Sequence, residues 1–376
     1  SAAVLLIVLR LAQGVSIGGE LIGSMSYIVE MAPPGKRGLH GSWTLFTAIG
    51  GILIGSIAVS LLRSTLDAEA VAAWGWRVPF LFGVAIAGVG IWLRLGLPES
   101  EAFEQASEED DSDRSPVVRA ITESGGRIAH LSALLALYGT GFYMLFVWMP
   151  TYYTDILQPP IPHAYMLNTV SMLLLLALLP LFGFLSDRVG RRPVLLVGMS
   201  LNALLVYPFF VAIDTGQVAF ALAAQLGFAV LIAAIQGPMP AYMAEMFPTR
   251  IRASALGISY NVTVGLLGGT APLVATWLIS STGNMAAPAF YLVFLSAVSI
   301  VALLPLRFRA GGPLRHAVHP EGVHLRPRPP GRAGLRTLLP RQPHGGRRRP
   351  RQRHLVLQLR HPPGQHVPVG ELRLGR

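Results

Sequence analysis

The sequence predicts an all-α protein that crosses a lipid membrane several times. Hydrophobic residues make up 52% of its 376 residues, charged residues only 13%, and the mean hydropathy is +0.52. Soluble domains contain about 25% charged residues. Nine apolar blocks reach or approach the roughly 20 residues that one helix needs to span a bilayer. The blocks cover residues 1–30, 40–62, 76–97, 128–157, 163–185, 193–213, 217–247, 254–281 and 286–306.

Several kinds of chemistry are excluded or unsupported by the composition. The chain has no cysteine, so it can form neither disulfides nor thiolate metal sites. We find no nucleotide-binding loop, metal-ligand cluster or nucleophile motif. The sequence therefore predicts no catalytic residue, no metal and no cofactor, and a protein that is not an enzyme.

The net charge of +11 comes from the end of the chain. Residues 307–376 hold 16 arginines and two acids, whereas residues 1–306 hold 14 Lys and Arg against 17 Asp and Glu. The segment 307–376 is rich in Arg, Pro, His and Gly and shows no helix or strand period. It is either a disordered basic tail or a GC-rich gene translated out of frame; we favour the second because the change is abrupt and lysine is absent. It has no aromatic residue after Phe308, so we expect no nucleic-acid partner.

Residues 98–127 form an acidic connector with Glu108, Glu109, Asp110 and Asp111 at its centre. Most Lys and Arg of residues 1–306 fall in this connector or in alternate short loops, and the loops after Ile156, Asp214 and Ser281 contain none. Positively charged loops stay in the cytoplasm. We therefore expect a multi-pass protein of the cytoplasmic membrane, the inner membrane of a bacterial cell, with the acidic loop inside.

An internal repeat divides the chain. Tyr27-Ile-Val-Glu30-Met-Ala-Pro33 followed by Arg37 matches Tyr242-Met-Ala-Glu245-Met-Phe-Pro248 followed by Arg252, at one offset of 215 residues. Counting helices, the first and seventh correspond, which gives a repeat of six helices, and parallel six-helix halves are common in transporters. Only three helices precede the acidic loop and six follow it, and the chain starts inside an apolar run. We therefore expect nine of twelve transmembrane helices: helices 4–6 of an N-terminal bundle in residues 1–97, the loop 98–127, helices 7–12 in 128–306, and the tail 307–376.

Charged residues and glycines gather in the basic turns. Asp187 ends one apolar block, where it can pair with nearby arginines or a helix dipole and latch one conformation. For Arg191 and Arg192 an alternative is simple anchoring to the cytoplasmic side. We interpret this whole set as a cytoplasmic gate or as structural salt bridges. The set is Glu30, Arg37, Gly183, Asp187, Arg188, Gly190, Arg191, Arg192, Glu245, Arg250 and Arg252.

The first block is unusually polar for a membrane segment. It carries Arg10, Gln13 and Glu20, and an ionisable residue in the hydrocarbon core costs about 2.5–3.5 kcal/mol on insertion scales, so such a residue usually faces a cavity or a partner. Arg10 and Glu20 are about 15 Å apart along a helix, too far to pair directly. Glu20 is the best proton carrier, with a structural ion pair as the alternative.

Other polar or aromatic residues in the apolar blocks are candidates to face a substrate at mid-membrane. Tyr143 and Trp148 could present π faces to a quaternary ammonium, and Arg10 could pair with a carboxylate, so a zwitterion satisfies both. Each could instead be an interfacial or helix-bridging residue. With Arg10, Gln13 and Glu20, the candidates for the substrate and proton pathway are Tyr138, Tyr143, Trp148, Asn168, Gln236, Tyr260 and Asn261.

Two sets of motifs resemble a known family. Gly183-Phe-Leu-Ser-Asp187-Arg188-Val-Gly190-Arg191-Arg192 resembles the loop motif of the major facilitator superfamily. The stretches from Arg10 to Glu20, from Glu30 to Gly38 and from Trp74 to Phe80, with Leu97-Pro-Glu-Ser100 and Phe247 to Ala255, resemble its metabolite:H+ symporter branch. That branch holds the proline/betaine, α-ketoglutarate, shikimate and citrate transporters.

This resemblance implies a major-facilitator-type fold and a secondary active transporter. We expect proton-coupled symport of a small zwitterion or organic acid, proline- or betaine-like or a dicarboxylate. The expected partners are the substrate, protons and the lipid bilayer, and the oligomeric state is not readable. The alternatives are a sensor on the same scaffold or a transport-inactive fragment.

Overall fold

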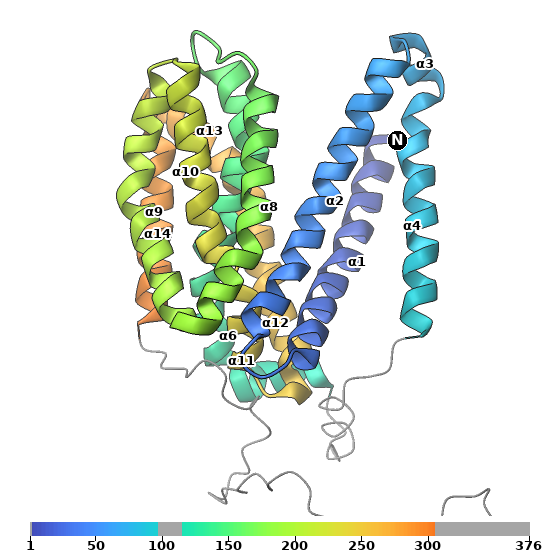
Figure 1. Cartoon of the computed structure of the whole chain (residues 1–376), viewed down its shortest axis with the longest axis vertical. Coiled ribbons are helices and arrows are strands. Elements are labelled where there is room, and N and C mark those ends of the chain that lie inside the picture. The colour runs from blue at the N-terminus through green and yellow to red at the C-terminus, as the bar shows by residue number, and fades with distance from the viewer. Residues whose placement is uncertain (1, 97–114, 305–376) are drawn as a thin grey trace, which may run out of the picture. The chain divides into compact units, whose positions relative to one another are not determined.

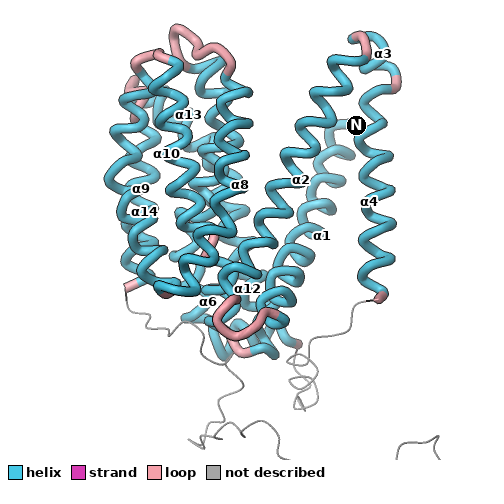
Figure 2. The backbone as a smooth tube through the Cα atoms, in the orientation of Figure 1, coloured by secondary structure: helices cyan, strands magenta, loops and turns pink. Residues whose placement is uncertain are grey.

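The computed structural model describes residues 2–96 and 115–304, and all regular secondary structure in these two stretches is helical (Figures 1 and 2). The described residues belong to one compact unit. The predicted tail 307–376 and most of the predicted acidic loop lie outside the described residues.

The first group of helices precedes the acidic loop. It consists of α1 (Ala2–Met31), α2 (Arg37–Thr65), the short α3 (Ala68–Ala73), the 3-10 turn η1 (Gly75–Arg77) and α4 (Val78–Leu95). Two prolines after α1 cannot continue the helix, and Gly35 takes a φ of 80° that a side chain would disfavour. The chain therefore turns sharply between α1 and α2.

The second group of helices follows the acidic loop and holds most of the core. Three stretches in it are π-helical, η2, η3 and η4. The elements are α6 (Pro116–Phe142), η2 (Tyr143–Trp148), α7 (Met149–Thr151), η3 (Tyr152–Ile156), α8 (Ala164–Val189), α9 (Arg191–Asp214), α10 (Val218–Gln236), α11 (Met239–Met246), α12 (Thr249–Thr263), η4 (Val264–Gly268), α13 (Gly269–Thr282) and α14 (Ala287–Leu303).

All nine predicted apolar blocks fall on helices, but fewer meet a strict test for spanning. Within the described residues, seven segments are long and apolar enough to cross a membrane. They are Arg37–Val59, Gly75–Leu93, Pro116–Ile156, Ala164–Val189, Arg191–Asp214, Val218–Met246 and Thr249–Thr282. The other two blocks are α14, which is apolar but only 17 residues long, and α1, which is 30 residues long but has many side chains outside the described residues. Seven membrane-competent segments are therefore confirmed among the described residues, and the count of nine transmembrane helices stays a prediction.

The boundary predicted at residue 127 differs from the structure. The acidic loop was expected to extend to that residue, but α6 already begins at Pro116, with a kink at Ser124. Proline suits the first turn of a helix, where its missing N–H is not needed. Arg119 and Ala120 are buried in this first part of α6, so packing stabilises a segment that its polarity made look like a loop.

The two groups of helices contact each other mainly through α2 with α8 and α11, and through α1 with α11 and α12. The α2–α8 crossing is close because two glycines meet there. A Cβ added at Gly183 would come within 2.5 Å of the Gly38 carbonyl oxygen and 2.8 Å of Ser42 Oγ. The turns α1–α2, α8–α9 and α11–α12 lie together near this crossing, at what we call the basic end; the turns α9–α10 and α13–α14 lie at the opposite end.

Candidate functional site

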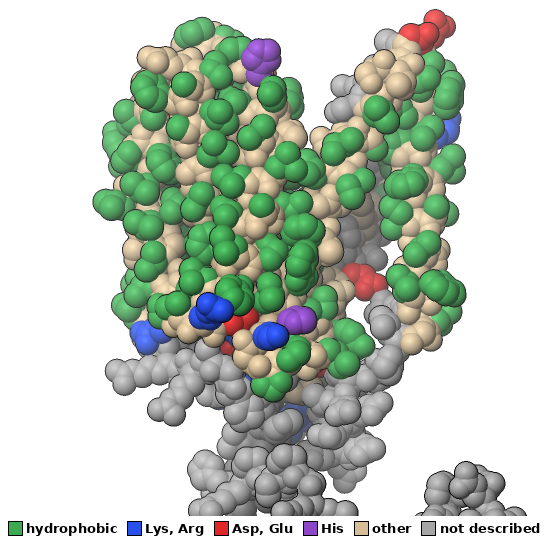
Figure 3. All heavy atoms as spheres, in the orientation of Figure 1, with side chains coloured by type: hydrophobic (Ala, Val, Ile, Leu, Met, Phe, Trp, Pro, Cys, Tyr) green, Lys and Arg blue, Asp and Glu red, His purple; other side chains and the backbone are tan. Residues whose placement is uncertain are grey.

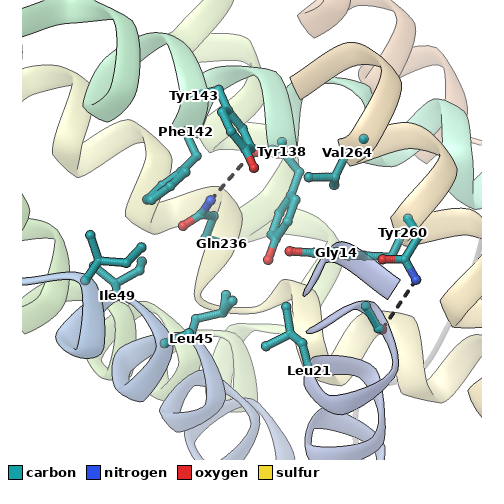
Figure 4. Close-up of a pocket in the computed structure, with 16 residues that line it drawn as sticks. Gly14, Leu21, Leu45, Ile49, Tyr138, Phe142, Tyr143, Gln236, Tyr260 and Val264 are labelled. Carbon is teal, nitrogen blue, oxygen red and sulfur yellow. Dashed lines mark hydrogen bonds between the residues drawn. The ribbon is translucent and has the colours of Figure 1, made fainter. Parts of the chain in front are cut away.

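A pocket of about 820 Å³ lies between the two groups of helices (Figure 4). Helices α1 and α2 form one wall, and α6, η2, α10, α12 and η4 form the other. Such a volume is within the range of small-molecule sites. The lining residues are Gly14, Gly18, Leu21, Leu45, Ala48, Ile49, Ile52, Tyr138, Gly139, Phe142, Tyr143, Gln236, Tyr260, Asn261, Val264 and Gly265.

Aromatic side chains dominate the wall contributed by the second group. Tyr138 and Tyr260 meet edge to face, with ring centroids 5.9 Å apart, and Phe142 and Tyr143 do the same at 6.1 Å. Edge-to-face packing leaves ring faces available, and a ring face attracts a cation. None of the lining residues that the structure describes is charged. The pocket therefore offers π faces rather than ion pairs to a cationic group.

Two amides supply polar contacts in the pocket. Gln236 is buried, and its Nε2 donates to the Tyr138 carbonyl at 3.4 Å, while its Oε1 has no hydrogen-bond partner among the described residues. Asn261 Nδ2 donates to the Gly18 carbonyl at 3.3 Å and so joins α12 to α1 (Figure 4). A buried unpaired acceptor costs about 1–3 kcal/mol, so a ligand donor at Gln236 Oε1 would be favourable.

Five of the ten residues predicted for the substrate and proton pathway line this pocket: Tyr138, Tyr143, Gln236, Tyr260 and Asn261. Two others pack inside the second group. Trp148 stacks on Tyr152 at 4.8 Å and donates its indole N–H to Thr276. Asn168 donates to the Phe146 carbonyl and accepts from Gln225. Both therefore bridge helices rather than face the pocket.

The three polar residues of α1 are placed differently. The α1 residues that line the pocket are Gly14, Gly18 and Leu21, which share one helical face. Glu20 and Gln13 are exposed and are not among the lining residues. The side chain of Arg10 lies outside the described residues. The roles predicted for these three residues remain predictions.

The apolar part of the pocket was not predicted from the sequence. The first group contributes aliphatic side chains from α2, including Leu45, Ile49 and Ile52, and the second contributes Val264. Such residues are indistinguishable in sequence from those that face lipid. The glycines at 14, 18 and 265 also line the pocket, where their missing side chains leave room for the cavity.

The predicted gate residues come together at the basic end, where most of the charged side chains visible in Figure 3 gather. Asp187 accepts hydrogen bonds from the backbone N–H groups of Gly38 and Leu39, each at 2.8 Å. These are among the first N–H groups of α2, which lack partners within the helix. Asp187 therefore caps α2 from the end of α8, across 148 residues of sequence.

Arg191 and Arg252 complete this ionic cluster. Arg191 pairs with Asp187 at 2.5 Å and with Glu245 at 3.2 Å. Arg252 pairs with Glu30, and it also donates to the carbonyls of Ala244 and Phe247. Their pairing partners come from both copies of the repeat, since the Glu of the first copy binds the Arg of the second.

The remaining gate candidates lie at the margins of the cluster. Arg37 is buried, within electrostatic range of Glu245 and Arg252. Arg250 pairs with Glu123 at 2.7 Å, and Arg188 lies over the ring of Phe184. Arg192 donates to the Leu304 carbonyl. Gly183 lies in the α2–α8 crossing, and Gly190 makes the α8–α9 turn with a φ of 105°.

A helical architecture with several membrane-competent segments and an internal pocket defines a multi-pass membrane protein. Residues 131–363 match the model of the Major Facilitator Superfamily, and residues 1–131 match that of the sugar (and other) transporter family. The first match covers more than half of the chain. The chain therefore belongs to the Major Facilitator Superfamily.

The curated relatives that the chain resembles are named as transporters. The chain is 34% identical over 325 residues to the glycine betaine/proline/ectoine/pipecolic acid transporter OusA of Dickeya dadantii, and 33% identical to a proline/betaine transporter of Salmonella typhimurium. In both cases 84% of this chain is matched, and the chain spans 65% of the length of the relative.

Among solved structures, the proton:xylose symporter XylE has a TM-score of 0.59 at 20% identity, over 75% of this chain and 66% of that one. The E. coli fucose:proton symporter FucP has a TM-score of 0.55 at 16% identity, over 75% and 72%. At these identities the likeness concerns the fold alone.

Proposed function

We propose that the chain forms part of a secondary active transporter that carries a small zwitterion together with a proton across the cytoplasmic membrane. The observation that carries this proposal is the pocket between the two groups of helices, lined by tyrosines, phenylalanine and two amides. A site between two helix groups can be exposed alternately to the two sides of a membrane when the groups rock against each other.

The chemistry of the lining favours a zwitterion with a quaternary ammonium over a dicarboxylate. Ring faces of Tyr138, Phe142, Tyr143 and Tyr260 suit a cation that carries no N–H donors. A dicarboxylate would need more than one cationic partner, and the described lining has none. The printed names of the relatives include betaine, which carries a quaternary ammonium, and proline, a zwitterion with a secondary ammonium.

The carboxylate of the solute and the proton need other groups. Arg10 precedes Gly14 by one helical turn in the sequence, and we retain it as the partner of the carboxylate. Glu20 is retained as the proton carrier on α1. The solved structures with the same fold are proton symporters, which supports coupling to protons.

We propose further that α1, α2 and α4 correspond to the fourth to sixth helices of a twelve-helix transporter, and residues 128–306 to the seventh to twelfth. The repeat supports this, because equivalent motifs end α1 and α11. The basic end, with the acidic loop, would face the cytoplasm by the positive-inside rule. The ionic cluster would then hold the cytoplasmic side closed.

Uptake by reconstituted protein tests the function. Proteoliposomes with an inward proton gradient should accumulate radiolabelled glycine betaine or proline, and a protonophore should abolish accumulation. Gln236→Ala should reduce uptake about tenfold or more, because it removes a buried polar group of the pocket. Thr215→Ala, a change in the exposed α9–α10 turn, is the matched control.

Three outcomes would count against specific parts of the proposal. Accumulation that survives dissipation of the proton gradient would contradict proton coupling. Binding of the solute without any uptake would favour the sensor, and neither binding nor uptake would favour an inactive fragment.

A further inference from the structure

We propose that Gly139 and Gly268 determine the substrate size that the pocket accepts, because each makes room for a pocket side chain of the facing helix. The inference rests on the proposed function only in taking this pocket as the solute site. It assigns a specificity role to two glycines, one of which, Gly268, does not itself line the cavity.

The two glycines form a reciprocal arrangement. Gly139 lies four residues before Tyr143, and Val264 lies four residues before Gly268. A Cβ at Gly268 would be 2.9 Å from Tyr143 Cδ2, and a Cβ at Gly139 would be 2.9 Å from Val264 Cγ2. Tyr143 and Val264 both line the pocket. Each of the two facing helices therefore has a glycine against which a pocket-lining side chain of its neighbour packs.

The backbones themselves are also close at this contact. The Cβ at Gly139 would lie 3.3 Å from Val264 Cα, and the Cβ at Gly268 would lie 3.4 Å from the Gly139 carbonyl carbon. The helices cannot absorb an added methyl group without moving apart along their whole packed contact. The Tyr143 ring is the part that can yield, and the cavity is the open space beside it. A side chain at position 268 should therefore push Tyr143 into the pocket and narrow it.

Two π-helical stretches begin at these residues, since Tyr143 opens η2 and Val264 opens η4. A π-helical turn inserts a residue into the helix and is frequent at functional sites. Within η2, the Phe146 carbonyl accepts a hydrogen bond from Asn168 Nδ2 at 3.3 Å, and Asn168 Oδ1 accepts from Gln225 Nε2 at 3.1 Å. These bonds hold the turn that carries Tyr143, which makes Asn168 a positioning residue for the pocket wall.

The absence of cysteine allows a test that does not depend on transport. Ile49→Cys places one thiol on the α2 wall of the pocket. In detergent-solubilised full chain, we would compare its reaction rates with aminoethyl and trimethylammonioethyl methanethiosulfonate. Gly268→Ala should lower the ratio of the trimethylammonioethyl rate to the aminoethyl rate about tenfold, because one methylene more or less in a pocket can change discrimination by that factor.

Gly269→Ala is the matched control, because its Cβ would meet nothing within 4 Å. It should leave the ratio of rates unchanged. An unchanged ratio in folded Gly268→Ala, or an equal change in Gly269→Ala, would overturn the inference. If Gly268→Ala does not fold, Tyr143→Leu is the second variant. It should widen the pocket at the same wall and so raise the ratio of the bulky-reagent rate to the small-reagent rate. An unchanged ratio in Tyr143→Leu would overturn the inference equally.

Ligand binding gives the second readout. Gly268→Ala should raise the Kd of N,N,N-triethylglycine more than that of glycine betaine, again by about tenfold relative to the parent. Equal changes in both Kd values would contradict a role in size selection. If the parent binds neither compound while the thiol ratios shift as expected, the proposed substrate class fails and the inference about the glycines stands.

Discussion

The Glu30–Arg252 pair is one of two almost fully buried ion pairs among the described residues, with Asp187–Arg191 as the other. Its side chains are 7% and 1% exposed, and Arg252 also donates to two carbonyls of the α11–α12 region. Two residues earlier, Arg250 pairs with Glu123 at side-chain exposures of 32% and 40%. Two arginines on one helical turn thus make pairs of very different burial.

Arg252→Gln should lower the free energy of unfolding by about 3–5 kcal/mol, because it removes the buried guanidinium charge that pairs with the Glu30 carboxylate. Arg250→Gln, the control, should cost about 0–1 kcal/mol, since exposed pairs contribute little. Thermal unfolding of the purified variants in detergent measures both.

The double variant Glu30→Gln/Arg252→Gln should be less destabilised than the sum of the two single variants, because the residues are directly coupled. Equal small losses for Arg252→Gln and Arg250→Gln would show that the buried pair does not stabilise the fold.

At the scale of elements, α2 and α8 are joined at the basic end by two contacts. Asp187 caps the first N–H groups of α2, and Gly38 faces Gly183 with no side chain between them. The same helices also meet higher up, where a Cβ at Gly50 would touch only Leu176 Cδ1, at 4.0 Å. The contact is therefore tight at the basic end and loose toward the pocket.

Gly183→Ala should separate α2 from α8 at the basic end, because its Cβ would meet a backbone oxygen that cannot give way. We expect a stability loss of about 1–3 kcal/mol, as for overpacked cores. Spin labels on cysteines at His40 and Val189 should move apart in this variant by double electron–electron resonance.

Gly50→Ala is the control on the same helix pair, and it should leave the distance distribution unchanged. A Gly183→Ala distribution identical to that of the parent would mean that the crossing tolerates a methyl group and does not set the helix separation.

At the scale of the whole molecule, charge is distributed unevenly between the two ends of the described part. The ionic cluster and its neighbours occupy the basic end, whereas the α9–α10 and α13–α14 turns contain no Lys or Arg. This distribution underlies the orientation that we propose.

Cysteine placement tests the orientation. In intact cells, a membrane-impermeant maleimide should label Ser281→Cys in the α13–α14 region but not Val189→Cys at the end of α8, although both positions are exposed. After permeabilisation both should react. Labelling of Val189→Cys in intact cells, with Ser281→Cys protected, would reverse the orientation.

The helices were predictable because length and hydropathy decide membrane insertion locally. Helix boundaries that depend on tertiary packing were not predictable in this way. Pro116 to Arg127 looked like a continuation of the acidic loop, but burial of Arg119 and Ala120 makes it part of α6. A Ser-Pro start was the available signal.

Only half of the residues predicted for the substrate and proton pathway line the pocket, and one failure has a physical reason. Tyr138 precedes η2 and lines the cavity, whereas Trp148 closes η2 and packs against Tyr152 and Thr276. A π-helical turn adds a residue, so the helical register that relates positions before it fails for those after it. Sequence spacing gives no warning of such a turn.

The close contact between Gly38 and Gly183 can also act as a pivot for α2. From Gly38 to Ile52 at the pocket, α2 rises about 21 Å, at about 1.5 Å per residue. If α2 moves as a stiff rod about that crossing, it is a lever with its fulcrum at the basic end. A tilt of about 10° would then displace Ile52 by about 4 Å, roughly the diameter of a methyl group. A small rotation where two glycines touch is thus amplified into a change large enough to admit or exclude a solute.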